Sequence, residues 1–559
     1  MDLYRAFLAV AISFVILLGY QYLFVKPALQ RQQSAVREQV LPETQKTTAT
    51  HQAEIARPAL NDGMQTTQPV AVRAEARSIT IDTPLYTAVI NEQGGGYSSF
   101  ELKNYREELK DSSGPMQLVM TKQPQELPVL FSLDNGGSII PLFVADQEKV
   151  TLSAGKQSQK LELKAGLDNG LNVTRILTFH ADSYLIDDVY QVTNSSEQPI
   201  QISPAITLIN EPFSHVHASQ RFLFAGPAAY TGGELIETKP KELEKGPEST
   251  HGEISWAGFV SNYFMTAVVP KLENQTTVTF SLAGGEERIR TVLAGGISSI
   301  PPQQSVAFRY SHYFGPKKLK ILQANGSDLA KAVNFGWFDV LAKPMLWLLN
   351  FFYSFAGNYG VAIILVTVLI KAVFWPITQK GMKSMKNMQK LQPKMAKLRE
   401  KYKDDPAKMN QEMMTMYKTY KVNPLGGCLP MLIQIPFFFA LYRVLMAAIE
   451  LRHAPFMFWI NDLSAPDRLW LGFDIPYLHG LPVLTLLMGA SMYLQQKMTP
   501  TVADPTQAKI MQFLPVIFTF MFLNFASGLV LYWFVNNLLS ILQQQLINRQ
   551  AKVPSGEER

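Results

Sequence analysis

A lysine inside an otherwise apolar stretch is the residue whose position most clearly suggests chemistry. Residues 359–378 read YGVAIILVTVLIKAVFWPIT, and Lys371 is the one charged residue among them. A helix of that length rises about 30 Å, enough to cross the hydrocarbon core of a bilayer. An ammonium group inside such a helix costs about 2.5–3.5 kcal/mol on insertion scales. Lys371 therefore needs a partner, a wet cavity or a route to the membrane interface.

Two interpretations of Lys371 stay open on this segment alone. Its aliphatic side chain can snorkel to the nearer interface, which would leave the helix an ordinary membrane span. Alternatively, Lys371 supplies the positive charge of a polar floor or groove within the membrane. The rest of the chain must decide between them.

The composition indicates a membrane protein that carries a large soluble domain. Of the 559 residues, 47% are hydrophobic, yet the mean hydropathy is only +0.02, because apolar runs towards both ends flank a polar middle. The single cysteine, Cys428, excludes a disulfide framework. A domain outside the cytoplasm must then rely on its own hydrophobic core, and a domain of this length can build one.

The N-terminal region predicts a membrane anchor followed by a tether. Residues 7–25 form an apolar run that is longer than the h-region of a signal peptide, and no small-x-small cleavage site follows it. We therefore expect an uncleaved signal-anchor helix within residues 1–26. Residues 27–75 are rich in Gln, Thr, Ala and Pro, a composition that predicts a disordered linker.

The polar middle, residues 76–326, predicts an all-β domain outside the cytoplasm. Apolar and polar residues alternate in runs such as 171–179 and 277–282, and Gly, Asn, Asp and Pro separate these runs, as is typical of a β-sandwich. The three glycines at 94–96 indicate a turn before a strand, because no strand–loop–helix context supports a phosphate-binding loop. His215 and His217 share a strand face, but no third ligand accompanies them. A binding or spacer domain is favoured over an enzyme.

The segment from 327 to 358 predicts connecting and interfacial helices. From Lys343 onward it reads KPMLWLLNFFYSF, which is short, aromatic and uncharged after the lysine. Such a helix is typical of one that lies on the membrane surface. Gly357 and Asn358 are expected to separate it from the transmembrane helix at 359–378.

Residues 379–427 predict a basic helical hairpin in the cytoplasm. They contain eleven lysines and one arginine against four acids, the strongest positive-inside signal in the chain. Lysines and methionines form two stripes at spacings of three and four, with a kink expected at Pro393 and a turn at Asp404-Asp405-Pro406. Methionine-rich surfaces suit varied apolar partners, and the lysines suit lipid headgroups or ribosomal RNA; a solvated loop with a modest core is the alternative. The residues expected to face a client or the ribosome are Lys383, Lys386, Lys390, Met385, Met388 and Met395.

Four further spans are predicted within residues 428–548. They run over 429–449, 475–495, 510–525 and 529–547, and Ser527-Gly528 separates the last two. Six spans place both termini in the cytoplasm, including the short tail at 549–559, and they place the β domain outside. This arrangement agrees with a cytoplasmic lysine-rich hairpin.

Two stretches resemble the YidC/Oxa-type membrane protein insertases. Residues 423–430, NPLGGCLP, continuing through Gln434 and Pro436, are similar to the signature of that family. Residues 527–533, SGLVLYW, followed by QQQ at 543–545, resemble its last span. The match covers about residues 330–550, and the added first span and β domain resemble the Gram-negative form of the family.

The resemblance implies both a fold class and a function. The fold is an α-helical membrane protein with one signal-anchor helix, a five-helix core, a periplasmic β-supersandwich similar to sugar-mutarotase folds, and a cytoplasmic helical hairpin. The function is that of an insertase and chaperone of the bacterial inner membrane, which inserts proteins through a hydrophilic, positively charged groove. Lys371 occupies the position of the groove charge, where many members have arginine; lysine keeps the charge but loses the fork that grips a carboxylate with two bonds. The candidate groove lining comprises Thr367, Gln434 and Tyr532.

The resemblance also implies partners, and it leaves competing readings to be tested. The expected partners are nascent inner-membrane proteins, the Sec translocon, membrane lipids and, weakly or transiently, the ribosome; no specific DNA, cofactor, metal or catalytic residue is expected. A secondary transporter or channel using Lys371 as a substrate site would usually show paired repeats with broken helices. A carbohydrate-active enzyme would rest on the fold of the β domain alone.

Overall fold

The structure is a computed structural model, and it describes most of the chain after residue 75. The described residues are 76–550 without 111, 137–139, 154–156, 214–223, 272–275, 285–286, 404, 421–428 and 499–504. The predicted signal anchor and linker, His215 and His217, Cys428 and the NPLGGC part of the signature all lie outside the described residues.

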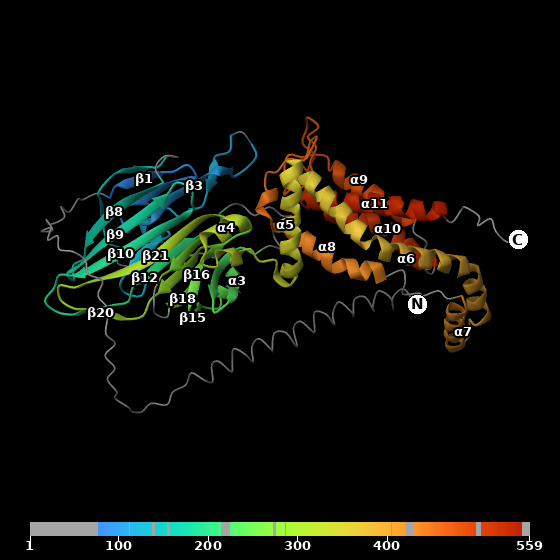
Figure 1. Cartoon of the computed structure of the whole chain (residues 1–559), viewed down its shortest axis with the longest axis horizontal. Coiled ribbons are helices and arrows are strands. Elements are labelled where there is room, and N and C mark those ends of the chain that lie inside the picture. The colour runs from blue at the N-terminus through green and yellow to red at the C-terminus, as the bar shows by residue number, and fades with distance from the viewer. Residues whose placement is uncertain are drawn as a thin grey trace, which may run out of the picture. The chain divides into compact units, whose positions relative to one another are not determined.

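The β domain consists of several sheets that share one core, as the alternating sequence predicts (Figure 1). A nine-stranded sheet has the order β14-β13-β16-β17-β21-β10-β9-β8-β6, and two five-stranded sheets have the orders β4-β3-β2-β1-β7 and β15-β18-β19-β12-β5. Strands β11 and β20 form a separate pair. Strand β1 pairs in parallel with β7, whereas β9 pairs antiparallel with both β8 and β10.

The strands occupy almost the whole range over which the sequence alternates. Their bounds are β1 Ser78–Asp82, β2 Tyr86–Asn91, β3 Tyr97–Arg106, β4 Pro115–Gln117, β5 Leu130–Ser132, β6 Val144–Ala145, β7 Lys149–Thr151, β8 Ser158–Gly166, β9 Leu171–His180, β10 Leu185–Asn194, β11 Ile200–Ile202, β12 Ala205–Asn210, β13 Gly226–Thr231, β14 Glu234–Glu237, β15 Glu248–Gly252, β16 Ile254–Val260, β17 Phe264–Pro270, β18 Thr276–Leu282, β19 Ile289–Ala294, β20 Ser298–Ile300 and β21 Ser305–Pro316.

Alternation decides which side chains enter the core of this domain. Along β9 every second residue from Leu171 to Phe179 is buried, while the residues between them are more exposed. The three glycines at 94–96 form the turn between β2 and β3, with positive φ at Gly94 and Gly95. This confirms the turn that the sequence predicts.

The C-terminal part of the chain is helical. The helices are α3 Pro240–Leu243, α4 Leu319–Asn325, α5 Asp339–Ala356, α6 Tyr359–Lys401, α7 Pro406–Thr419, α8 Leu429–Ala447, α9 Val483–Met498, α10 Pro505–Phe522 and α11 Ser527–Gln550, with short 3-10 turns η2 Pro124–Glu126, η4 Leu329–Ala332, η5 Gly336–Phe338 and η7 Ile449–Leu451. Helix α11 packs against α6, α8 and α9, and α5 packs against α6 and α8 (Figure 1).

The breaks around α5, α6 and α7 fall where the sequence predicts them. Gly357 closes α5 in the left-handed conformation, and the Asn358 side chain caps α6 by accepting a hydrogen bond from the Val361 amide. Helix α6 then continues through Pro376 and Pro393 to Lys401 without ending. The Asp405 side chain caps α7 in the same way, with Pro406 at its first position.

The predicted span at 475–495 starts too early. Helix α9 begins at Val483, and the preceding residues form a loop in which Leu469 and Leu481 exchange two backbone hydrogen bonds of 2.8 Å. Gly480 has a positive φ of 151°, and Pro482 lies immediately before the helix. Because proline and a left-handed glycine both favour a break, the apolar residues at 475–482 belong to this loop.

One described helix is long and apolar enough by itself to cross a membrane. That helix is α6, while the apolar parts of α8 and α10, Ile433–Ala447 and Gln512–Phe522, are shorter. The six spans and the domain boundaries expected from the sequence therefore stay predictions.

Candidate functional site

Lys371 lies on the buried face of α6. Thr367, Lys371 and Thr378 are spaced by four and seven residues, so they share one face of the helix. The side chain of Lys371 is only 9% exposed. The Thr367 hydroxyl donates to the carbonyl oxygen of Ile363 at 2.7 Å, and the Thr378 hydroxyl donates to that of Phe374 at 3.0 Å.

Among the described residues, one neutral side chain accepts a hydrogen bond from the ammonium group of Lys371. Its Nζ donates to the Oγ of Ser540 at 2.8 Å, and Ser540 in turn donates to the carbonyl oxygen of Asn536 at 2.8 Å. No carboxylate among the described residues forms an ion pair with Lys371. An ammonium group has three N–H donors, so its hydrogen-bonding capacity is only partly used.

Helix α11 supplies a row of polar side chains opposite α6. Tyr532, Asn536, Ser540 and Gln543 recur at intervals of three or four residues, which places them on one face. Gln543 donates to the Thr378 hydroxyl at 2.8 Å and is 1% exposed. We call Lys371, Thr378, Gln434, Asn536, Ser540 and Gln543 the polar cluster.

The groove lining predicted from the sequence lies in and beside the polar cluster. Gln434 on α8 donates to the Asn536 side chain at the long distance of 3.5 Å. Tyr532 is buried, and its ring stacks on Phe438 at a centroid distance of 6.1 Å. Thr367 is buried one turn before Lys371, with its hydroxyl turned to its own helix.

Sequence reasoning did not place Asn536, Ser540 or Gln543 in the groove, although Gln543 belongs to the QQQ stretch at 543–545. Their spacing inside an apolar helix is the signal that would have found them, because polar residues recurring every three or four positions define a helix face. Asn537 belongs to another face, since it donates to the Ser491 Oγ at 3.1 Å and so joins α11 to α9.

The basic hairpin has a small methionine core. Met388, Leu391 and Met395 are buried and pack against Met413, Met416 and Tyr417 of α7. Met385 is half-buried, while Lys383 and Lys390 are exposed. Lys386 donates to the Asn548 side chain near the end of α11 at 3.2 Å. Two of the three methionines expected to face a client therefore lie inside the hairpin in this arrangement.

A second buried cation lies in the β domain and is paired with a carboxylate. Arg175 contacts both carboxylate oxygens of Asp188 at 2.8–3.1 Å, and its Nη1 donates to the Gly95 carbonyl oxygen at 2.5 Å. The guanidinium also lies 5.0 Å from the ring centre of Tyr190. His312 Nε2 approaches Asp188 at 3.2 Å, and burial lowers the pKa of His312 to about 4. This cluster joins β9, β10 and β21 inside the core of the domain.

Within the described residues, no group of three or more His, Cys, Asp or Glu side chains is placed to hold a metal ion.

Two family models match the chain. The model described as 60Kd inner membrane protein matches residues 351–555, and the model described as YidC periplasmic domain matches residues 78–348. The membrane protein insertase YidC of Syntrophus aciditrophicus strain SB is 42% identical to this chain over 559 residues, which cover 98% of this chain and 99% of that protein.

Solved structures also match at low identity, and two of them illustrate the two parts of the chain. The crystal structure of an active YidC insertase with its first transmembrane domain resolved is 20% identical, with a TM-score of 0.34, and covers 84% of this chain and 92% of that one. A galactose mutarotase related enzyme from Lactobacillus acidophilus is 11% identical, with a TM-score of 0.31, and covers 43% of this chain and 97% of that one. Similarities at this level carry no argument about activity.

Proposed function

The chain belongs to the YidC family of membrane protein insertases, and from that premise we propose that its clients' outside segments cross the membrane past the polar cluster around Lys371. Family membership makes the chain an insertase of the inner membrane with a periplasmic β domain, and its substrates are membrane proteins. It decides against the transporter, channel and carbohydrate-active enzyme readings that the sequence alone left open.

The observation that carries the proposal is the incomplete hydrogen bonding of Lys371. Ser540 is the one described partner of its ammonium group. The remaining donors are then available to water or to a carboxylate of the client. A lysine needed only for packing would be expected to have its donors satisfied or to reach the membrane interface.

The physical task of an insertase is to lower the free-energy barrier for moving a client's polar outside segment across the hydrocarbon core of the membrane. Each unsatisfied polar group of a client's outside segment costs several kcal/mol in hydrocarbon. A wet groove lined by Lys371, Thr367, Gln434 and Tyr532 would shorten the dry part of the path, and the lysine would attract client acids transiently. No covalent step or nucleotide is required for such a transfer.

The client's apolar helix would leave along the outer faces of the third and last spans, α8 and α11. Leu538, Leu542 and Leu546 are exposed at intervals of four residues and form an apolar stripe on α11. Phe439 is exposed on α8. In a bilayer these side chains offer an apolar surface along which a helix can slide into lipid.

We also propose the topology that the charge pattern favours. The hairpin, both termini and the tail at 549–559 would lie in the cytoplasm, with Lys383 and Lys390 exposed to lipid headgroups or a translating ribosome. Trp347 and Phe355 are exposed on α5, which suits a helix lying at the outer interface. Work beside the Sec translocon is proposed from the family resemblance.

The test is insertion of a single-span client with an acidic outside segment into liposomes that contain only this protein. Wild type and Lys371→Arg should insert the client at similar rates, and Lys371→Ala should insert it much more slowly, because arginine keeps the charge and alanine removes it. Equal insertion by all three proteins would show that the charge is not part of the mechanism. The fraction of client protected from external protease measures the outcome.

A further inference from the structure

A buried oxygen in the polar cluster has no hydrogen-bond donor among the described residues. It is the side-chain oxygen Oε1 of Gln543 on α11, and Gln543 is 1% exposed. Buried polar atoms are rarely left without a partner in folded proteins, and an ordered water molecule commonly satisfies those that the chain does not. The Oε1 atom therefore marks a position where a donor is expected.

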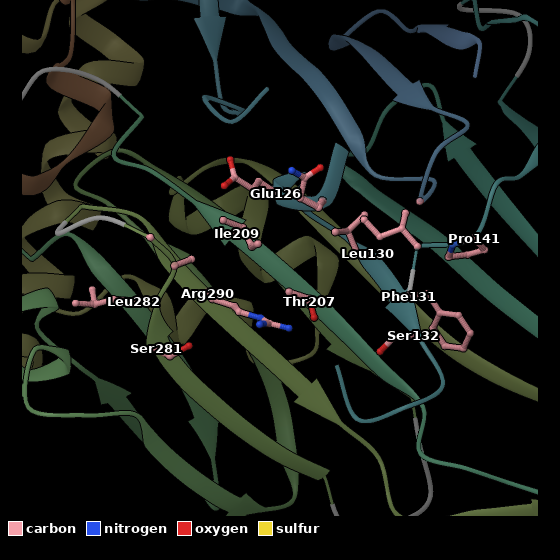
Figure 2. A pocket seen from close by; sticks show the side chains of 15 residues that line it. Glu126, Leu130, Phe131, Ser132, Pro141, Thr207, Ile209, Ser281, Leu282 and Arg290 are labelled. Carbon is pink, nitrogen blue, oxygen red and sulfur yellow. The ribbon is translucent and has the colours of Figure 1, made fainter. Parts of the chain in front are cut away.

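Another unsatisfied group lies in the β domain and provides a comparison. Figure 2 shows the Arg290 side chain extending towards Thr207 across a hollow of about 350 Å³. The Nε of Arg290 is buried without an acceptor among the described residues, while its Nη2 donates to the carbonyl oxygen of Gly136. Arg290 lies on β19, outside the helices that surround Lys371. In the polar cluster, by contrast, an unsatisfied acceptor occurs together with a cation that has donors to spare.

The hydrogen bonds of Thr378 fix the orientation of the Gln543 side-chain amide. The single hydroxyl proton of Thr378 is directed to α6 itself, where the carbonyl oxygens of Phe374 and Trp375 lie 3.0 and 3.1 Å from the hydroxyl oxygen. The Thr378 oxygen can therefore only accept from α11, and Nε2 of Gln543 donates to it at 2.8 Å. The same Nε2 lies 3.5 Å from the Trp375 carbonyl oxygen. Because Nε2 is committed to α6 in this way, Oε1 is left without a bond to Thr378.

The unused donors of Lys371 lie at an adjacent level of the same pair of helices. The Nζ of Lys371 donates to Ser540, which itself donates to the carbonyl oxygen of Asn536, so Ser540 can only accept from the ammonium group. Two of its three N–H groups have no acceptor among the described residues. Ser540 and Gln543 are three residues apart on α11 and share the face that meets α6. Spare donors and a spare acceptor therefore occur on neighbouring turns where α6 and α11 meet.

We propose that Gln543 is a positioning residue for Lys371, acting through one bridging water molecule. In this arrangement the ammonium group donates to the water and the water donates to Oε1, while Thr378 holds the other end of the amide. A buried water needs two or more polar partners, and a bridge through water is nearly as favourable in enthalpy as a direct hydrogen bond. One N–H group of Lys371 then remains for the client.

The bridge gives the ammonium group a fixed direction. A lysine side chain has several rotatable bonds, and ordering them when a carboxylate arrives costs entropy. Two restraints, Ser540 and the water on Gln543, remove part of that cost before the client binds. In assigning the third N–H group to a client carboxylate, the inference rests on the proposed function.

The direct test needs no client. Full-length protein in lipid nanodiscs is treated with acetic anhydride, and mass spectrometry measures how fast Lys371 is acetylated. Gln543→Leu releases one restraint and should raise that rate about threefold, which corresponds to the loss of one weak hydrogen bond. Gln543→Glu places a carboxylate at the end of the bridge and should lower the rate about threefold or more, because the ion pair keeps the amine protonated and unreactive.

The matched control lies on another face of α11. Asn537 donates through its side-chain amide to Ser491 of α9 at 3.1 Å, and Ser491 donates to a carbonyl oxygen of its own helix, as Thr378 does on α6. Asn537→Leu removes an amide that joins two helices, just as Gln543→Leu does. It should leave the acetylation rate of Lys371 unchanged.

A second pair of variants leaves Gln543 in place. Thr378→Val removes the hydroxyl that holds the amide and should raise the acetylation rate of Lys371 as Gln543→Leu does. Thr378→Ser keeps the hydroxyl and should behave like wild type. Both variants remain informative if Gln543→Leu does not fold.

Insertion into liposomes tests the consequence for clients. Two clients are compared, one with an aspartate in its outside segment and one with an asparagine in its place. The ratio of their insertion rates should fall about threefold in Gln543→Leu and stay unchanged in Asn537→Leu. If the ratio does not depend on Lys371 either, while the acetylation results hold, the positioning of Lys371 stands and the proposed function fails.

Three results would overturn the inference. Equal effects of Gln543→Leu and Asn537→Leu on acetylation would reduce Gln543 to a brace between helices. Faster acetylation in Gln543→Glu would show that this side chain does not reach the ammonium group. An insertion ratio that depends on Lys371 but not on Gln543 would show that the client meets a lysine that Gln543 does not position.

Discussion

Two deeply buried cations among the described residues of this insertase are held in different ways. Arg175 in the β domain contacts both oxygens of Asp188, the Gly95 carbonyl oxygen and the ring of Tyr190. Lys371 in the helical core contacts one serine hydroxyl among the described residues. Burial of a charge is tolerated when hydrogen bonds and an opposite charge compensate for the lost water.

This difference in how the two charges are compensated distinguishes a structural role from a functional one. We call a buried cation saturated when a carboxylate compensates its charge, as Asp188 does for Arg175, and its removal is expected to affect folding. An unsaturated cation such as Lys371 keeps donors available, so its removal is expected to affect transport more than folding. The predictions below test this distinction, from the largest expected effect to the smallest.

Breaking the saturated pair should have the largest effect. Asp188→Ala leaves Arg175 buried without its carboxylate, which we expect to destabilise the β domain by about 3–5 kcal/mol. Pulse proteolysis of the full-length protein in urea measures the stability of the domain. The exposed pair Glu162–Lys164 on β8 is the control, because Glu162→Ala should change stability by about 1 kcal/mol or less. Similar losses in both variants would contradict the assignment of Arg175 as a structural cation.

The same cluster predicts a pH dependence. Burial lowers the pKa of His312 to about 4, whereas an unfolded histidine titrates near 6.5. As pH falls below about 6.5, His312 binds a proton in the unfolded chain but not in the folded domain. The free energy of unfolding therefore decreases until about pH 4. The expected loss over that range is on the order of 3 kcal/mol. Pulse proteolysis at pH 7.5 and 5.0 should show a lower free energy of unfolding at pH 5.0, and His312→Gln should make this difference smaller. An equal difference in wild type and His312→Gln would exclude His312 as its cause.

The smallest effect is expected at the hydroxyl that holds Lys371. Ser540→Ala removes the described partner of the ammonium group but leaves its charge in place, so we expect insertion of an acidic client to slow by about threefold, which corresponds to the lower end of the net contribution of one hydrogen bond. Ser540→Thr keeps the hydroxyl and should restore the rate. If threonine and alanine are equally slow, the effect comes from packing rather than from positioning of Lys371.

The position of the buried lysine and the extent of the β domain could be predicted from the sequence. Lys371 is conspicuous in an apolar run, and period-two alternation locates the β domain because it depends only on neighbouring residues. The caps at Asn358 and Asp405 are equally local. Such features follow from short-range rules of helix and strand formation.

Which side chains pair with each other depends on contacts between distant parts of the chain. The pairing of Arg175 with Asp188 depends on the register of β9 against β10, and that of Lys371 with Ser540 on how α11 packs against α6. Met388 and Met395 show the same limit, because an apolar stripe on a helix looks alike whether it packs inside a hairpin or faces a client. Sequence periodicity gives the face of an element but not its partner.

The most direct test of the central claim is a double-mutant cycle between Lys371 and a client carboxylate. Insertion rates would be measured in liposomes for wild type and Lys371→Met, each with a client whose outside segment contains one aspartate or an asparagine in its place. The account predicts that Lys371→Met slows the aspartate client by about fivefold to tenfold and leaves the asparagine client nearly unchanged, a coupling of about 1 kcal/mol or more. Equal slowing of both clients would show that Lys371 does not act on client charge and would contradict the account.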